Sequence, residues 1–174
     1  MQVRLATAED AEPIAGVHVR SWQIAYRGLI PDETIDNLDV VERAARWRSI
    51  FDQSGQDVFV AVEGGRIRGF CSLQLSRDKE HLNQSVGELS AIYVDPAHWR
   101  KGLGRALCLA AVARARLRGF DDLVLWVLEE NHDARSFYEE MGFVREKVGF
   151  TRGFGGGVEL SQIRYLKRIG SRAV

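Results

Sequence analysis

The sequence of 174 residues has few of the features that mark secreted or membrane proteins. Its two cysteines, Cys71 and Cys108, lie in apolar stretches without a pairing pattern, which predicts buried thiols in a reducing compartment. No N-terminal apolar segment has the form of a signal peptide, and no apolar run is long enough to span a bilayer. We therefore expect a cytoplasmic protein without a membrane partner.

The chain also lacks an excess of either charge, because 24 lysines and arginines stand against 24 aspartates and glutamates. Proteins that bind nucleic acid through its phosphates need a basic surplus, so we expect no nucleic-acid partner. A chain of this length can bury a substantial core, and no internal repeat or second domain is visible in the sequence. These features predict a single domain over residues 1–174.

The pattern of apolar residues predicts an α/β protein, with a mixed central β-sheet and helices on both faces. Turn-rich segments are expected to be loops, and His81 in one of them is expected to be solvated. These loop segments are residues 31–38, 77–85 and 151–157. We expect strands at residues 2–6, 58–62, 66–76, 88–94, 123–128, 144–150 and 158–166, and helices beginning at Thr7, after Asp39, near Gly102 and at Asp133.

A glycine-containing turn joins the strand that ends at Asp95-Pro96 to the longest predicted helix. Gly102 and Gly104 stand at the helix start, where backbone N–H groups are unpaired and the helix dipole is positive. Glycine has no Cβ atom that would hold a phosphate away from these N–H groups. The turn therefore predicts an anion site that fits a pyrophosphate. Added positive charge comes from Arg100, Lys101 and Arg105.

Two other kinds of nucleotide-binding protein with glycine-rich turns do not fit this sequence. A dinucleotide-binding oxidoreductase would have its third glycine at the position of Leu107, and its motif would open the domain. A P-loop nucleotidase would have Gly-Lys followed by Ser or Thr after the turn. Neither pattern is present.

The turn resembles the cofactor-binding motif of the GCN5-related N-acetyltransferase (GNAT) family, which reads Arg or Gln, two residues, Gly, one residue, Gly or Ala. Gly102 and Gly104 match the motif, whereas Trp99 occupies the Arg/Gln position. A later segment resembles the family's Asn-x-x-Ala-x-x-x-Tyr-x-x-x-Gly-Phe pattern. Its matching residues are Asn131, Ala134, Tyr138 and Gly142-Phe143.

The resemblance covers nearly the whole chain and implies a GNAT-like fold with acetyl-CoA as co-substrate and no metal. It implies that the central strand holds the pantetheine arm and faces the thioester, while the turn holds the pyrophosphate. Asn131 would bond either the pantetheine amides or its own turn backbone. The implied cofactor-binding residues are Ile92, Tyr93, Val94, Arg100, Lys101, Gly102, Leu103, Gly104, Arg105, Asn131 and Tyr138.

Acetyl transfer to a primary amine needs a base, because an amine with a pKa of about 10.4 is neutral in only about one in two thousand molecules at pH 7. Glu88 in the central strand is the candidate base, directly or through water, by resemblance to the family. Strand alternation is expected to place it on the face that carries Ser90, Ile92 and Val94. The alternative role for Glu88 is an ion pair with an arginine such as Arg68.

The reaction also needs an acid for the departing thiolate. In the family, the tyrosine at the position of Tyr138 points its hydroxyl at the thioester sulfur and can protonate it. The alternative for Tyr138 is a helix residue that packs on the sheet. Together, Glu88 and Tyr138 favour an enzyme over the second hypothesis, a non-catalytic acetyl-CoA-binding sensor or regulatory module.

The acceptor is not selected by the sequence, and both small-molecule amines and peptide or protein amines remain open. Trp22 and Tyr26 on the first helix are candidates for lining the acceptor pocket, with core packing as the alternative. Ser90 in the central strand is a further candidate. The strand near Val158 is expected to be an edge strand that could join two copies as a homodimer.

Overall fold

The computed structural model describes residues 1–53, 55–81, 85–153 and 158–170, and it is built on one seven-stranded sheet. The strands are β1 (Gln2–Leu5), β2 (Asp57–Glu63), β3 (Arg66–Leu75), β4 (Val86–Val94), β5 (Asp122–Leu128), β6 (Val144–Gly153) and β7 (Glu159–Arg168). Their order is β1-β2-β3-β4-β5-β7-β6. β4 and β5 pair in parallel, and the other neighbours pair antiparallel, so the sheet is mixed as predicted.

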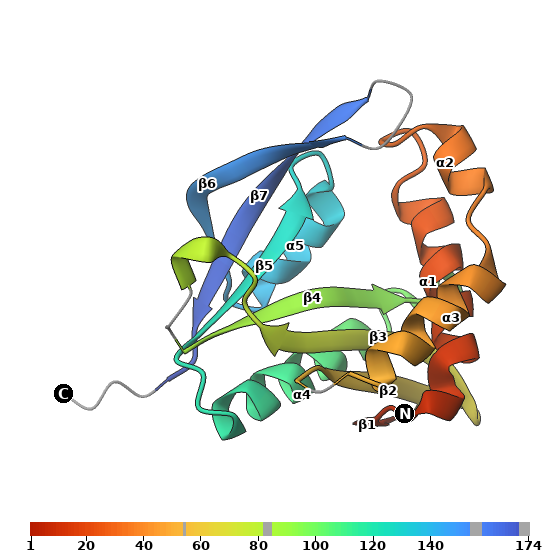
Figure 1. The fold of residues 1–174 in the computed structure, drawn as a ribbon, viewed down its shortest axis with the longest axis horizontal. Helices are drawn as coiled ribbons and strands as arrows, with labels where there is room; N and C mark the ends of the chain where they lie inside the picture. Colours follow the sequence, from red (N-terminus) through yellow and green to blue (C-terminus); the bar gives the residue numbers. More distant parts are fainter. Residues whose placement is uncertain (54, 82–84, 154–157, 171–174) are drawn as a thin grey trace.

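Helices cover both faces of this sheet (Figure 1). The helices are α1 (Ala11–Ala25), α2 (Asp32–Asp36), α3 (Val40–Phe51), α4 (Leu103–Leu117) and α5 (His132–Glu140). One apolar cluster joins α1 and α3 to β2 and β3, and another joins α4 and α5 to the opposite face. No helix among the described residues is long and apolar enough to cross a membrane.

Three expected loops and one expected edge strand differ from the structure. The 31–38 segment contains α2, the 77–85 segment contains a short 3-10 helix at Lys79–His81, and β6 extends to Gly153. Residues 82–84 and 154–157 of these segments lie outside the described residues. The predicted edge position of the strand near Val158 is wrong, because β7 pairs with β5 on one side and β6 on the other. A homodimer formed by sheet extension would use β1 or β6.

The central feature of the sheet is the short parallel contact between β4 and β5. Val86–Glu88 pair with Asp122–Val124, and no further pair of described residues joins the two strands. Figure 1 shows β4 and β5 spreading apart from this point. The second half of β4 therefore has no strand partner on the side that faces β5.

A β-bulge in β4 decides which face each of its side chains occupies. The register of β3 against β4 shifts between Ser72 and Leu73, and the extra residue on β4 is Ser90. One extra residue reverses the alternation of the side chains that follow it. Glu88 therefore lies on the same face as Tyr93, the face that packs against α1 and α3.

The face predicted for Glu88 is wrong for this reason. Ile92 and Val94 pack with α4 in the other apolar cluster, on the opposite face of the sheet from Glu88. A strict period of two places Glu88, Ile92 and Val94 together only in a strand without a bulge. The bulge separates the candidate base from the side chains that support the glycine turn.

Gly87 allows β4, β5 and the segment before β5 to meet closely. A Cβ atom at this position would lie 2.6 Å from Phe120 Cδ2 and 2.8 Å from Leu123 Cδ2. Both neighbours are buried, so they have little room to move. The closed end of the β4–β5 opening therefore requires glycine.

We expect Gly87→Ala to lower the free energy of unfolding by about 1–3 kcal/mol, the usual cost of overpacking a core. Urea unfolding followed by circular dichroism measures this change. Gly153→Ala is the matched control, because a Cβ atom there would meet nothing within 4 Å. Equal unfolding free energies for wild type and Gly87→Ala would contradict this account of the junction.

An aromatic cluster around His18 joins α1 and α3 to the sheet. The His18 ring stacks on Tyr93 with centroids 5.0 Å apart, and Trp47 Nε1 donates a hydrogen bond to His18 Nδ1 at 3.3 Å. Burial and, to a lesser extent, the charge of Arg43 lower the pKa of His18 from 6.5 to about 3. The ring is therefore neutral at pH 7, with its proton on Nε2 because Nδ1 accepts.

This lowered pKa makes stability depend on pH. Below pH 6.5 the unfolded chain protonates His18 and the folded chain does not, so the contribution of His18 to stability is lost as the pH falls towards 3. We expect the difference in unfolding free energy between wild type and His18→Phe to shrink by about 2 kcal/mol from pH 7 to pH 4.5. Urea unfolding at both pH values tests this. His132→Asn, at an exposed position, should keep the wild-type dependence.

Candidate active site

The turn before α4 presents a row of free backbone donors. Arg100 and Gly102 have left-handed backbone angles, with φ values of +59° and +84°. Among the described residues, nothing accepts a hydrogen bond from the six backbone N–H groups of Arg100 to Arg105, and the first N–H that donates is that of Ala106, to Gly102 O at 3.0 Å. Free N–H groups at the positive end of a helix dipole form an anion site.

The side chains of this turn are placed less uniformly than the sequence suggests. Arg100 forms an ion pair with Asp133 at the start of α5, with a distance of 3.2 Å from Nη2 to Oδ1. Lys101 Nζ donates to Ala97 O at 3.0 Å, and Arg105 is exposed. The backbone N–H groups are thus the unpaired donors of the candidate anion site, whereas the side chains of Arg100 and Lys101 already have partners.

Trp99, at the position where the family motif has Arg or Gln, ties the turn to the end of β4. Its Nε1 donates to Val94 O at 2.7 Å, and Ser21 Oγ on α1 donates to the same oxygen at 3.0 Å. The Val94 carbonyl is therefore already bonded twice. Ile92 and Tyr93, the other two predicted pantetheine contacts, lie in the half of β4 that has separated from β5.

Tyr138 on α5 is buried and packs against the rings of Phe143 and Tyr165, with centroids 6.1 and 6.5 Å away. No group in the described part of the chain forms a hydrogen bond with its hydroxyl. Burial raises the pKa of Tyr138, and Tyr93 and two cysteines raise it further. The hydroxyl is thus a neutral proton donor at pH 7 that lies near β4 and α4.

Asn131 caps the first turn of α5. Its Oδ1 accepts a hydrogen bond from Ala134 N at 3.2 Å, so the structure places it in contact with its own turn backbone. This contact uses the oxygen of the side-chain amide and leaves its nitrogen, which has two N–H donors, for another acceptor. A bond from that nitrogen to the pantetheine arm stays a prediction.

Glu88 is almost fully buried, with 2% of its surface exposed, and its carboxylate is held by Arg77. Arg77 Nη2 lies 2.6 Å from Oε1, while Arg77 Nε and the Arg77 backbone N–H each donate to Oε2 at 3.2 Å. The predicted ion-pair partner, Arg68, is therefore wrong. Most of the Arg77 side chain is exposed, so the pair joins a buried carboxylate to a solvent-accessible cation.

Trp22 and Tyr26 contact each other and reach β4. Their rings are 4.9 Å apart, and the Tyr26 hydroxyl lies 3.2 Å from the hydroxyl of Tyr93. They border a small apolar cluster with α2, β5 and β7, made of Ile30, Ile35, Leu128 and Leu160. Ser90 Oγ donates to the backbone oxygen of Ser72 on the neighbouring strand β3 at 3.3 Å. Both aromatics are therefore partly core residues.

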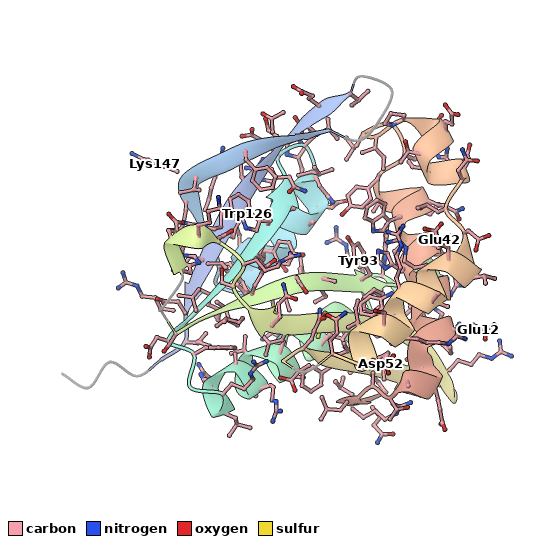
Figure 2. The ribbon with its side chains drawn as sticks, in the orientation of Figure 1. Glu12, Glu42, Asp52, Tyr93, Trp126 and Lys147 are labelled. Carbon is pink, nitrogen blue, oxygen red and sulfur yellow. The ribbon has the colours of Figure 1, made fainter. Side chains whose placement is uncertain are left out.

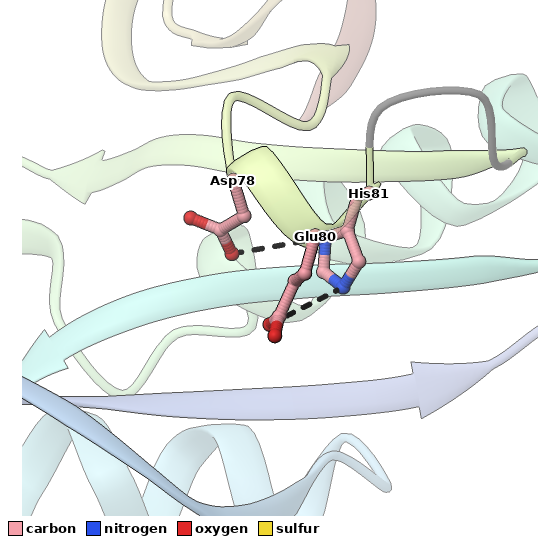
Figure 3. Close-up of side chains that lie close together, drawn as sticks. All are labelled: Asp78, Glu80 and His81. Carbon is pink, nitrogen blue, oxygen red and sulfur yellow. Dashed lines mark ion pairs between the residues drawn. The ribbon is translucent and has the colours of Figure 1, made fainter.

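An ionic cluster that the sequence pattern does not predict lies beside Glu88, on the face of the sheet that packs against α1 and α3. Arg164 on β7, 4% exposed, bonds to Asp78 at 3.0 Å and also to Glu80 and Glu146. Figure 3 shows the side chains of Asp78, Glu80 and His81 close together. Their oxygen and nitrogen atoms that could bind a metal ion lie within 4.8 Å of one another. His81 is buried and bonds Ser76 Oγ at 2.8 Å, so its predicted solvation is wrong.

The only sequence signal for this cluster was an arginine between Ile163 and Tyr165 in an apolar strand. Arg164 brings one positive charge to three carboxylates, so it offsets only part of their charge. Trp126 on β5 joins it through Nε1, which donates to Asp78 Oδ1 at 3.2 Å. Figure 2 shows Trp126 on β5 and Tyr93 at the α1 end of β4, on either side of the opening.

A pocket of about 410 Å³ lies elsewhere, where the register of β6 against β7 shifts between Arg145 and Gly149. Its lining consists of these two residues, the three between them and Ile163. None of the predicted site residues takes part in it. We therefore place the candidate site at the opening between β4 and β5.

The chain is similar to known proteins both in sequence and in fold. Residues 20–143 match the sequence model of the acetyltransferase (GNAT) family. YuaI of Bacillus subtilis (strain 168), named an uncharacterized N-acetyltransferase, is 37% identical over 130 residues, which are 74% of this chain and 72% of YuaI. A mycothiol acetyltransferase of Thermobispora bispora is 39% identical over 98 residues, which are 56% of this chain and 32% of that protein.

Solved structures share the fold. PaiA N-acetyltransferase of Thermoplasma acidophilum, in complex with coenzyme A, matches with a TM-score of 0.74 at 22% identity, covering 97% of this chain and 99% of PaiA. YncA of Salmonella typhimurium, with its cofactor acetyl-CoA, matches with a TM-score of 0.76 at 23% identity, covering 100% and 96%. The match over residues 20–143 and the likeness to YuaI confirm what the two sequence motifs predicted: the chain belongs to the GNAT family of acetyl-CoA-dependent N-acetyltransferases.

Proposed function

We propose that this enzyme transfers the acetyl group of acetyl-CoA to a primary amine by direct attack. The observation that carries the proposal is the row of free backbone N–H groups from Arg100 to Arg105, at the start of the helix that follows β4. In the proposal, these groups hold the pyrophosphate and the unpaired half of β4 holds the pantetheine arm. Relatives named mycothiol acetyltransferase favour a small-molecule acceptor over a protein one.

In this proposal, Tyr138 supplies the proton for the leaving thiolate. The amine nitrogen bonds to the acetyl carbon, the carbon–sulfur bond breaks, and the phenol proton goes to the sulfur. The hydroxyl is protonated at neutral pH, as the acid in this step must be, although burial raises its pKa and so makes it a weaker acid. The lack of a described hydrogen-bond partner also leaves the hydroxyl free to donate to the cofactor.

Glu88 is proposed as the group that receives the amine proton, directly or through water. It lies on the face of Tyr93 and Tyr26, the same side as the proposed acceptor pocket. Its carboxylate oxygens accept hydrogen bonds from Arg77, whose side chain is mostly exposed. In the proposal, the amine proton goes to one of these oxygens.

The proposal is tested by the release of coenzyme A thiol from acetyl-CoA with a panel of amino acids, polyamines, aminoglycosides, other amines and peptides. Calorimetric binding of acetyl-CoA is measured alongside. Release with one amine class supports the enzyme and identifies its acceptor class. Binding without release by any acceptor favours the second hypothesis, a non-catalytic acetyl-CoA sensor, and absence of binding overturns the cofactor site.

Tyr138→Phe should reduce kcat by at least about a hundredfold, the usual range for losing a general acid, and leave acetyl-CoA affinity within a few-fold. The ring packing is kept, and the hydroxyl has no described partner to lose, so the fold should be unchanged. Tyr165→Phe is the control, because it removes a buried hydroxyl bonded to Glu139 instead. Wild-type kcat in Tyr138→Phe would remove Tyr138 from the mechanism.

Two variants separate a base role of Glu88 from a structural one. Glu88→Gln should lower kcat by at least about tenfold and remove the acidic limb of the pH profile. Arg77→Gln breaks the same ion pair but keeps the carboxylate, so it should retain kcat. If both variants lose activity equally, Glu88 acts through its ion pair and not as a base.

A further inference from the structure

Arg43 on α3 has an unusual environment for a partly buried cation. Its guanidinium lies over the ring of Trp22, with Cζ 5.7 Å from the centroid. Among the described residues, no carboxylate forms an ion pair with it, because the neighbouring Glu42 pairs with Arg46 at 2.5 Å. Burial lowers the pKa of Arg43, and the like charge of Arg46 lowers it further. Tyr93 and Glu42 offset this shift only in part, so Arg43 is a partly buried cation without an ion-pair partner among the described residues.

Two further donors beside Arg43 have no acceptor. His18 Nε2 and Trp22 Nε1 are buried side-chain atoms without a hydrogen-bond partner in the described part of the chain. His18 itself is more than nine-tenths buried. Because His18 Nδ1 accepts from Trp47, Nε2 carries the proton. The two N–H groups are one turn apart on α1, and buried donors without an acceptor destabilise a protein.

This donor group, made of Arg43, His18 and Trp22, borders the proposed acceptor pocket. Trp22 contacts Tyr26, whose hydroxyl lies 3.2 Å from that of Tyr93, and His18 stacks on Tyr93 directly. Tyr93 lies on the face of β4 that also carries Glu88. The donor group therefore lies on the same face of β4 as Glu88, at the Tyr93 end of the strand.

We propose that the acceptor is an amine that also carries a carboxylate, and that Arg43 binds this carboxylate with help from the N–H groups of His18 and Trp22. The inference rests on the proposed acetyl transfer and narrows its substrate class. A carboxylate has one negative charge and two acceptor oxygens, which match one unpaired guanidinium and two unpaired N–H groups. A phosphate would bring a second negative charge, and Arg46, the nearest other cation on α3, is already paired.

The test compares the common L-amino acids with their carboxamides as acceptors for the full-length enzyme, by coenzyme A thiol release. We expect KM to be at least about tenfold lower for the acids than for the amides. Arg43→Gln should raise KM for the acids by at least about tenfold, leave KM for the amides unchanged and keep kcat within about threefold. Arg48→Gln, at an exposed position on the same helix, should match wild type.

The outcomes separate this inference from the proposed function. Efficient acetylation of amides or uncharged amines, unaffected by Arg43→Gln, would overturn the carboxylate site while leaving the acetyltransferase proposal intact. A lower KM for phosphoethanolamine than for every amino acid would assign the site to a phosphate instead. If no acceptor releases thiol, calorimetry with N-acetyl amino acids and their amides decides, and binding that is independent of the carboxylate overturns the inference.

Discussion

The structure depends on the short length of the parallel pairing between β4 and β5. The strands share only the contact of Val86–Glu88 with Asp122–Val124, and Gly87 permits the close approach that holds them there. A parallel pair that continued further would satisfy the backbone of both strands and leave no room for a thioester arm. Because the pair separates, one long strand keeps β3 as a partner on one side and offers free backbone groups on the other. The opening proposed as the active site is thus a consequence of incomplete sheet pairing, and it is closed at one end by Gly87.

Because of the bulge at Ser90, the side chains of β4 with different proposed roles lie on opposite faces of the sheet. Beyond it, Ile92 and Val94 support α4, so the anion-binding turn is packed against the same strand that would hold the pantetheine arm. On the other face, Glu88 and Tyr93 look towards α1 and α3, where the acceptor is proposed to bind. A single inserted residue therefore lets one strand serve the cofactor on one face and the acceptor on the other. Without it, the candidate base would point into the α4 core.

The sequence was informative where the signal is local and silent where partners come from far along the chain. The glycine turn, the helix that follows it and the Asn131 cap depend on neighbouring residues, and the structure contains all three. The bulge could not be predicted from the sequence, because no break in the apolar pattern marks Ser90. The Glu88 partner was missed for a related reason, since Arg77 is placed by the turn after β3 and not by the strand pattern that suggested Arg68. The interior position of β7 was missed because a hairpin pattern does not say which of its strands inserts beside β5.

The net charge of the chain does not show how charge is distributed around the opening between β4 and β5. The chain has no net charge, and several arginines near the opening have carboxylate partners, such as Arg20 with Asp95, Arg77 with Glu88 and Arg164 with three acidic residues. Such pairs hold distant segments of the chain together. In each pair, the carboxylate reduces the positive field of the arginine that a substrate would meet. Arg43 differs because its acidic neighbour is engaged elsewhere, so its field extends into the space beside Trp22. A neutral composition is therefore compatible with a locally electropositive surface beside Trp22, and in the proposal it is Arg43 that selects the acceptor.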